Sequence, residues 1–341
     1  MKYKYCGAIH IHSVLSDGTG CVEEIAKAAK QAGLSWIIIT DHNNFDAKEG
    51  LYDGVCVIKG EEISPGNQNH YLAFDINKYI SPTNDAQNFI NEVRAQGGFG
   101  IVAHPKESET RKNHYPPINW LDKSITGDGV EIWNWMSDWA DIYDEQNILN
   151  AAKSFLFRNN SLKGPSKETL EWWDLQNNNT EKIIPAIGGI DAHALKIKKY
   201  GFPLTIFSYK YMFTKLTNII YLDEKLPDNF EKQKEMILKA IKQGNNIIIN
   251  KHWSKKLIPE FFIKNKTECK YSGESIFIDD QTELIIESIK NTVTKIYKNG
   301  INIYTTEKFS DKIKIEKSGK YRIESYYKGK PWVYTNPIIV K

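Results

Sequence analysis

Hydrophobic positions in the first 250 residues alternate between short apolar runs and longer amphipathic segments. The apolar runs predict buried strands, which we place at 5–11, 35–40, 55–63, 99–103, 129–133, 183–190 and 246–249. The segments with apolar residues on one helical face predict helices at 22–32, 85–96, 144–157, 167–177 and 230–243. Strands that alternate with helices predict a parallel sheet, and this length of alternation is enough to close a (β/α) barrel.

The pattern changes near residue 254. Short β-branched or aromatic runs, separated by Asn-Gly, Ser-Gly and Lys-Gly turns, predict strands at 275–278, 283–289, 295–298, 302–305, 312–316 and 321–327. We therefore expect two domains, a barrel over residues 1–253 and a small antiparallel β-sandwich-like module over residues 254–341.

Composition narrows the class of protein. With 26% charged and 41% hydrophobic residues, the chain is a folded rather than a disordered polypeptide. No run approaches the roughly 18 apolar residues of a membrane helix. The four cysteines have no CxxC spacing, which suggests a reducing compartment, the cytoplasm. A net charge of +3 gives no support for nucleic-acid binding.

Chemistry-bearing residues gather at one end of the predicted barrel strands. Six of the eight histidines and three acidic residues lie at or just after the carboxyl ends of these strands: His10, His12, Asp17, His42, Glu62, His70, His104, Asp191 and His193. A barrel places its active site at this end. One His-x-His pair alone would favour packing or surface histidines, but several such groups after different strands favour a shared metal site.

Ordered motifs along the chain resemble one known family. They are HIHSVLSDG at 10–18, TDHN at 40–43, GEEIS at 60–64, NHYLAF at 69–74, AHP at 103–105, VEIWN at 130–134 and GGIDAH at 188–193. Together they resemble the PHP family (polymerase and histidinol phosphatase domain), and more narrowly its CehA/McbA-like branch of metal-dependent hydrolases. The resemblance implies a distorted (β/α)₇ barrel with up to three metal ions.

The resemblance also implies a ligand set. His10, His12, Glu62 and Asp191 match the first metal site; Glu62 bridges to a second site with His70 and His104; Asp17, His42 and His193 match the third. Mixed imidazole and carboxylate ligands suit two or three ions of Zn²⁺, Mn²⁺ or Fe²⁺ better than Ca²⁺ or Mg²⁺. Glu61 faces the opposite side of an extended strand, so we expect it to be solvated or to contact the ligand residues rather than the metals.

The expected nucleophile is a hydroxide that bridges the metals, because no motif for a protein nucleophile occurs in the chain. Four side chains follow the strand that ends at His104 and either bind a substrate phosphate or form a solvated loop: Lys106, Arg111, Lys112 and His114. Asn134, at the end of another strand, is a further candidate contact.

The leading hypothesis is therefore a metal-dependent phosphoesterase, a phosphatase or phosphodiesterase acting on a small phosphorylated molecule or nucleotide. The alternative within the same family is hydrolysis of a carboxylic ester, carbamate or amide. A second alternative is a non-catalytic binding protein in which the metals only stabilise the barrel.

Overall fold

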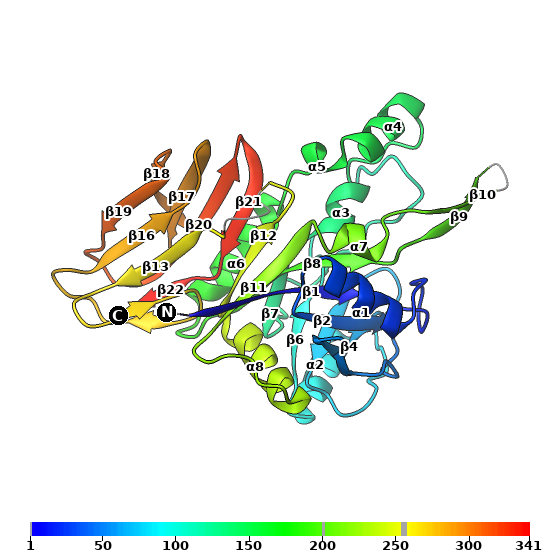
Figure 1. Ribbon diagram of the computed structural model, residues 1–341, viewed down its shortest axis with the longest axis horizontal. Helices are drawn as coiled ribbons and strands as arrows, with labels where there is room; N and C mark the ends of the chain where they lie inside the picture. The colour runs from blue at the N-terminus through cyan, green and yellow to red at the C-terminus, as the bar shows by residue number, and fades with distance from the viewer. Residues whose placement is uncertain (1, 200–201, 254–257) are drawn as a thin grey trace.

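Seven strands close into a barrel in the computed structural model, which describes residues 2–199, 202–253 and 258–341. Strand β8 pairs with β1 and completes the ring (Figure 1). The ring runs in the order β1 (Tyr3–Ile11), β2 (Trp36–His42), β4 (Val55–Ile63), β5 (Tyr71–Phe74), β6 (Phe99–Val102), β7 (Gly129–Asn134) and β8 (Ala186–Ala192). The predicted seven-stranded α/β barrel is confirmed.

Strand β5 is the exception to the predicted parallel sheet. It runs antiparallel to both of its neighbours, β4 and β6. Only a short loop joins Ile63 to Tyr71, and a parallel crossover needs about a dozen residues or more. The reversal places His70, at the start of β5, beside the carboxyl end of β4.

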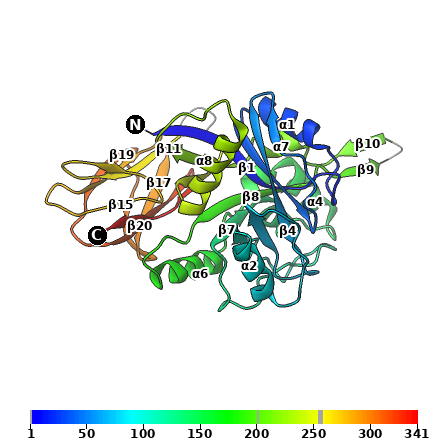
Figure 2. The ribbon, with the colours of Figure 1, turned by 90° about the horizontal axis from the view of Figure 1, so that it is seen from below.

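The described ranges contain eight helices, and Figure 2 shows three of them, α1, α2 and α8, along the outside of the barrel strands. The eight helices are α1 (Val22–Gln31), α2 (Ala86–Ala95), α3 (Trp135–Ala140), α4 (Ile148–Leu156), α5 (Arg158–Ser161), α6 (Lys167–Asn178), α7 (Tyr209–Met212) and α8 (Phe230–Gln243). Helix α8 begins at a side-chain cap from Asn229 and ends at Gly244, whose φ of 73° is in the left-handed region that favours glycine. Its buried Ile237 and Ile241 pack against the barrel strands.

The sheet continues beyond the barrel into the carboxyl-terminal residues. The first half of β1 also pairs with β11 (Leu216–Leu222), which pairs with β12 (Asn246–Asn250), which in turn pairs with β21 (Lys330–Thr335). The other strands of this large sheet are β3 (Gly50–Tyr52), β15 (Ser275–Ile276), β17 (Thr292–Lys298), β18 (Ile301–Thr306), β20 (Gly319–Tyr327) and β22 (Ile338–Val340).

A second sheet completes the carboxyl-terminal region. It contains β14 (Cys269–Lys270), β13 (Glu260–Lys264), β16 (Glu283–Glu287) and β19 (Ser310–Lys314). Side chains from this sheet, such as Phe261 and Leu284, share an apolar core with Ile323 and Ile338 of the large sheet. The predicted small β module is therefore present as two packed layers (Figure 1), while β9 (Lys196–Lys199) and β10 (Phe202–Thr205) form a separate hairpin.

One buried asparagine connects the two parts of the chain. Asn336 accepts a hydrogen bond from the Ala186 backbone N–H at 2.6 Å and donates to the carbonyls of Ala186 and Asn246. Together with the β12–β21 pairing, this contact crosses the predicted boundary at residues 253 and 254. The division into two domains stays a prediction.

None of the helices in the described ranges is both long and apolar enough to cross a membrane. Each of the four cysteines is a free thiol, and Cys56 is buried while Cys269 is exposed.

Candidate metal centre

The nine predicted metal ligands lie together at the carboxyl end of the barrel. Their nitrogen and oxygen atoms form four overlapping groups, within each of which all the ligand atoms lie within 4.8 Å of one another. The groups are His10, Glu62 and His104; His10, His12 and Asp191; His42, Glu62 and His70; and His12, Asp17, His42 and His193. The grouping differs in part from the one that the resemblance implies, because His70 and His104 fall in different groups and His12 also joins the Asp17 group.

Glu62 is the centre of the cluster. Its carboxylate is fully buried and contacts five imidazoles: His10 at 3.1 Å, His12 at 3.3 Å, His42 at 3.2 Å, His70 at 2.8 Å and His104 at 3.3 Å. Burial raises the pKa of a carboxyl group, but the imidazoles of His42, His10 and His70 outweigh it and hold the pKa of Glu62 well below its usual range. Glu62 is therefore ionised, with its two oxygens directed at different groups of histidines.

Asp17 lies at the solvent side of the cluster. Its side chain is 56% exposed, and its Oδ1 atom lies 3.2 Å from Nε2 of His193. Burial lowers the pKa of the nearby His42 to about 4, so this imidazole is neutral at neutral pH, as a metal ligand must be. Because Asp17 is exposed, the group of ligands that contains it is open to the cavity described below.

The donor set fits divalent cations. The Nε2 atom of His12 is buried and lies 3.3 Å from Glu62 and 3.1 Å from Asp191, yet makes no hydrogen bond within the described chain. The buried Nδ1 atom of His104 likewise has no hydrogen-bond partner among the described residues. Buried polar atoms without partners cost free energy, and a cation among these nitrogens and carboxylates would remove part of that cost.

The backbone at three of these residues is unusual. His10, His104 and Asp191 have φ angles of 68°, 25° and 53°, in the left-handed region that residues other than glycine rarely adopt. The pairing of β1 with β8 shifts register between Ile9 and Ile11, so His10 and His12 meet through a bulge rather than by regular strand alternation. Their ring centroids are 5.2 Å apart.

Glu131 is a site residue that sequence reasoning did not assign. It is buried in the middle of β7, where Oε1 bonds Nδ1 of His10 at 2.8 Å and Oε2 accepts the His104 backbone N–H at 2.7 Å. Gly189 leaves room for it, because a Cβ at this position would collide with the Glu131 carboxylate. A carboxylate bonded to Nδ1 leaves Nε2 of His10 free to bind a metal. The signal in the sequence was an acidic residue inside the apolar strand of the VEIWN motif.

We expect Glu131→Gln to weaken metal binding about 10- to 100-fold. The Oε2 atom of Glu131 accepts hydrogen bonds from the backbone N–H of His104 and from Nδ2 of Asn134. If the N–H₂ group of the glutamine took the place of Oε2, it would face these two donors. An amide turned the other way would face Nδ1 of His10 and favour the tautomer with a proton on Nε2. Competition with a chromogenic chelator measures the affinity for metal, and circular dichroism of the metal-free variant checks the fold. A folded variant with wild-type metal affinity would contradict this role of Glu131.

Two further polar residues shape the cluster, and neither was assigned a role from the sequence. Asp41 is buried and accepts hydrogen bonds from the backbone N–H of Ser13 at 2.6 Å and from the hydroxyl of Ser16 at 2.6 Å. It thereby fixes the loop that carries Asp17. The hydroxyl of Ser64 lies 2.7 Å from Nδ1 of His42 and orients that ring.

Glu61 points away from the cluster, but it is not solvated. Its side chain is fully buried, and its Oε2 atom accepts the Ile80 backbone N–H at 2.9 Å. Burial raises the pKa of this carboxyl to about 7. The expectation of a solvated Glu61 is therefore wrong, because the loop at Ile80 covers the outer side of β4.

A cavity of about 390 Å³ opens onto the centre. Six of the nine predicted ligands line it: Asp17, His42, His70, His104, Asp191 and His193. Of the five predicted substrate contacts, Arg111 and His114 also line this cavity. Lys106 and Asn134 border a separate hollow, and Lys112 borders another near Asp144. Asn134 also lies beside the centre, because its amide is 3.3 Å from Asp191.

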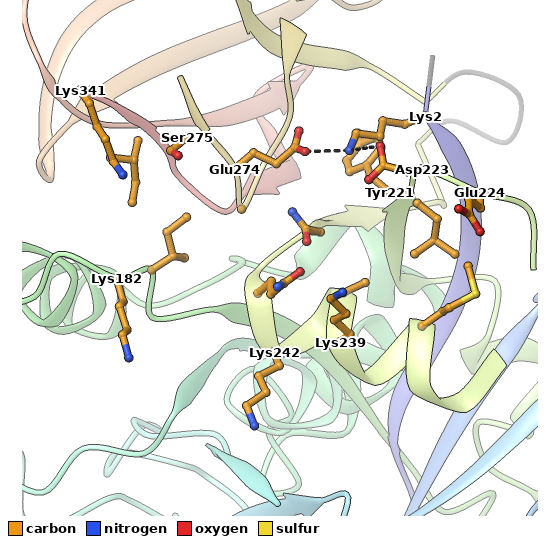
Figure 3. Close-up of a pocket in the computed structure, with 18 residues that line it drawn as sticks. Lys2, Lys182, Tyr221, Asp223, Glu224, Lys239, Lys242, Glu274, Ser275 and Lys341 are labelled. Carbon is orange, nitrogen blue, oxygen red and sulfur yellow. Dashed lines mark hydrogen bonds and ion pairs between the residues drawn. The ribbon is translucent and has the colours of Figure 1, made fainter. Parts of the chain in front are cut away.

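A larger hollow of about 780 Å³ lies elsewhere, between α8 and the carboxyl-terminal strands. Figure 3 shows lysines around it, including Lys182, Lys239 and Lys242, and the ion pairs of Lys2 with Asp223 and Glu274. None of the nine predicted ligands lines this hollow, so its size does not make it the reaction site.

Three solved structures are similar to this chain. A two-domain protein from Bacteroides vulgatus ATCC 8482 that contains a predicted PHP-like metal-dependent phosphoesterase is 15% identical, with a TM-score of 0.46, over 98% of this chain and 95% of that one. PsfC from Pseudomonas syringae PB-5123 is 12% identical, with a TM-score of 0.41, over 68% and 88%. A candidate metal-dependent phosphoesterase from Bifidobacterium adolescentis ATCC 15703 is 15% identical, with a TM-score of 0.37, over 69% and 96%.

These likenesses are too low to carry an argument about function. Comparison with curated proteins gave no significant match. The PHP domain model, in contrast, matches residues 8–249, which include all nine predicted ligands and the barrel strands apart from the first five residues of β1. The narrower CehA/McbA-like assignment stays a prediction. By the extent of this match, the chain belongs to the PHP domain family.

Proposed function

We propose that this protein is a metal-dependent hydrolase, and specifically a phosphoesterase that acts on a small phosphorylated molecule or nucleotide. The observation that carries the proposal is the convergence of nine imidazole and carboxylate side chains with Glu62 at their centre, six of which line one cavity. Such a set would hold two or three divalent ions, of Zn²⁺, Mn²⁺ or Fe²⁺.

Charge balance favours a phosphoryl group over a neutral substrate. The nine side chains include three carboxylates, from Asp17, Glu62 and Asp191. With the imidazoles neutral when they bind metal and one bridging hydroxide, three divalent ions would leave two positive charges on this set of ligands, and two ions would leave none. A phosphoryl group brings the negative charge that this excess attracts, whereas an ester or amide carbonyl does not.

Side chains around the candidate metal centre have roles that fit this chemistry. Bound divalent ions lower the pKa of a water ligand and neutralise negative charge on the substrate. Glu131 holds the ring of His10, and Ser64 holds the ring of His42. Ser137, which lines the cavity, donates its hydroxyl to Glu107, so this serine is not prepared to act as a nucleophile.

One observation favours the second candidate, hydrolysis of a carboxylic ester, carbamate or amide. Much of the cavity wall is apolar, including Met136, Trp139 and Phe207. A neutral substrate would enter such a cavity without the desolvation cost of a charged one. Hydrolytic attack at carbon needs the same activated water.

Turnover separates the candidates. Protein loaded with Zn²⁺, Mn²⁺ or Fe²⁺ should hydrolyse p-nitrophenyl phosphate or bis-p-nitrophenyl phosphate, and vanadate should inhibit it. Hydrolysis of p-nitrophenyl acetate with no turnover of any phosphoester would refute the leading proposal and support the second. Full metal occupancy without turnover of either class would leave the non-catalytic alternative.

A further inference from the structure

Part of the wall of the cavity that opens onto the metal centre is built from aromatic and aliphatic side chains. They come from four separate segments, namely α3, the residues before and within α4, the residues after β10, and the loop that follows His104. The wall residues are Tyr115, Ile118, Met136, Trp139, Tyr143, Phe155, Ile206 and Phe207. We call them the apolar wall.

Ring contacts hold this wall in place. Trp139 stacks on Tyr143 at 4.9 Å between centroids and meets Phe155 at 5.1 Å and Phe207 at 4.8 Å. Trp139 and Phe207 are only 5% and 6% exposed, whereas Met136, Tyr143 and Ile206 are half-buried. The buried rings thus fix the wall, and the half-buried side chains present apolar surface to the cavity.

Arg111 is the one guanidinium among the described residues that line the cavity, and it offers little free positive charge. Nε of Arg111 lies 2.6 Å from Asp141, and its NH1 lies 2.9 Å from Glu107. The remaining contacts of this guanidinium are to the carbonyls of Pro116 and Ser137. Two carboxylates therefore neutralise the charge of Arg111, and a second anionic group of a substrate would find no counter-charge there.

From these contacts we infer that the substrate carries a bulky apolar group, an aromatic ring or an alkyl chain, next to the bond that is hydrolysed, and that the apolar wall binds it. This inference rests on the proposed function and specifies the substrate class. The cavity volume of about 390 Å³ is in the lower part of the range of ligand pockets, roughly 300–1,000 Å³. The metal centre would bind the phosphoryl end and the wall the apolar end.

Alkylphosphonates test the inference without turnover. Calorimetry of the metal-loaded protein with ethyl-, butyl- and hexylphosphonate should show affinity that rises about fourfold for each methylene buried against the wall. Equal affinities, or a decrease with chain length, would overturn the inference.

Two variants test whether the apolar wall causes the dependence of affinity on chain length. Met136→Ser should lower the affinity for hexylphosphonate about tenfold and leave that for ethylphosphonate unchanged, which shows that the metal centre is intact. Ile206→Ser is a second variant, in case the first fails to fold. The matched control is Leu149→Ser, because Leu149 is 69% exposed on α4 and does not line the cavity. An equal loss for both ligands, or none for either, would contradict binding by the wall.

Alkyl hydroxamates of the same lengths distinguish this inference from the proposed function. If hydroxamates bind with a chain-length dependence while phosphonates do not bind, the phosphoester proposal fails and the apolar subsite stands. If phosphonates bind without such dependence, the subsite fails and the phosphoester proposal stands. If neither series binds the metal-loaded protein, both are overturned.

Discussion

Glu62→Gln should abolish turnover and remove metal from the protein. Glu62 contacts five imidazoles from four segments of the barrel, since His10 and His12 both belong to the end of β1, and no other residue of the cluster has so many. An amide can bind a cation through one oxygen only and carries no charge, so it cannot link the two groups of histidines that Glu62 joins. We expect a loss of activity greater than the roughly 10- to 100-fold that follows removal of a residue behind a metal ligand, with at least one metal equivalent missing in elemental analysis.

The neighbouring residue provides the control. Glu61→Gln changes the adjacent carboxylate in the same way, but Glu61 is buried on the opposite side of β4 and bonds the Ile80 backbone. This variant should keep wild-type metal content and activity. Retention of metal and turnover in folded Glu62→Gln protein would refute the proposed centre, and equal losses in both variants would indicate a general defect of β4.

Of the variants proposed for this protein, Arg322→Met should lower the free energy of unfolding most. The Arg322 side chain is 4% exposed and pairs with Asp174 of α6 at 2.6 Å and with Glu324 at 2.8 Å. Its removal would leave Glu324, which is 3% exposed, as a buried charge without its partner. Breaking a buried ion pair from one side costs about 3–5 kcal/mol of unfolding free energy, which denaturation in urea or guanidinium chloride measures.

A surface pair provides the comparison for this variant. Lys266 and Asp280 lie 2.7 Å apart with both side chains exposed, and Asp280→Asn should leave the unfolding midpoint unchanged because solvent screens such pairs. An Arg322→Met variant as stable as the wild type would contradict the structural role of this pair. The same experiment tests the predicted domain boundary, because one transition would indicate that residues 254–341 unfold together with the barrel and two would support the division.

Local pattern was enough to predict most of the barrel and the positions of the metal-ligand candidates. Each apolar run ends in a polar motif, and the carboxyl ends of barrel strands meet at one rim whatever the details of packing. His42 and Glu62 could therefore be placed near each other although they come from different strands. The prediction missed the four-residue strand β5, because so short an apolar run gives little signal. It also counted 246–249 among the barrel strands, whereas this strand, β12, pairs antiparallel with β11 and β21 outside the ring.

The supporting residues could not be predicted in the same way. The role of Glu131 depends on Gly189 in the neighbouring strand, because a Cβ atom there would collide with the Glu131 carboxylate. The burial of Glu61 depends on the loop at Ile80. These contacts join residues that are far apart in the chain, and no periodicity encodes them.

The order of residues alone thus indicated the family, most of the strand and helix framework and the candidate donor atoms of the centre, because each depends on short segments that carry their own signal. The tertiary structure alone decided which side chains orient those donors and what lines the cavity beside them. Helix α3, helix α4 and the residues after β10 form the apolar wall only when packed together, since its shape arises from contacts between segments and not within any one of them.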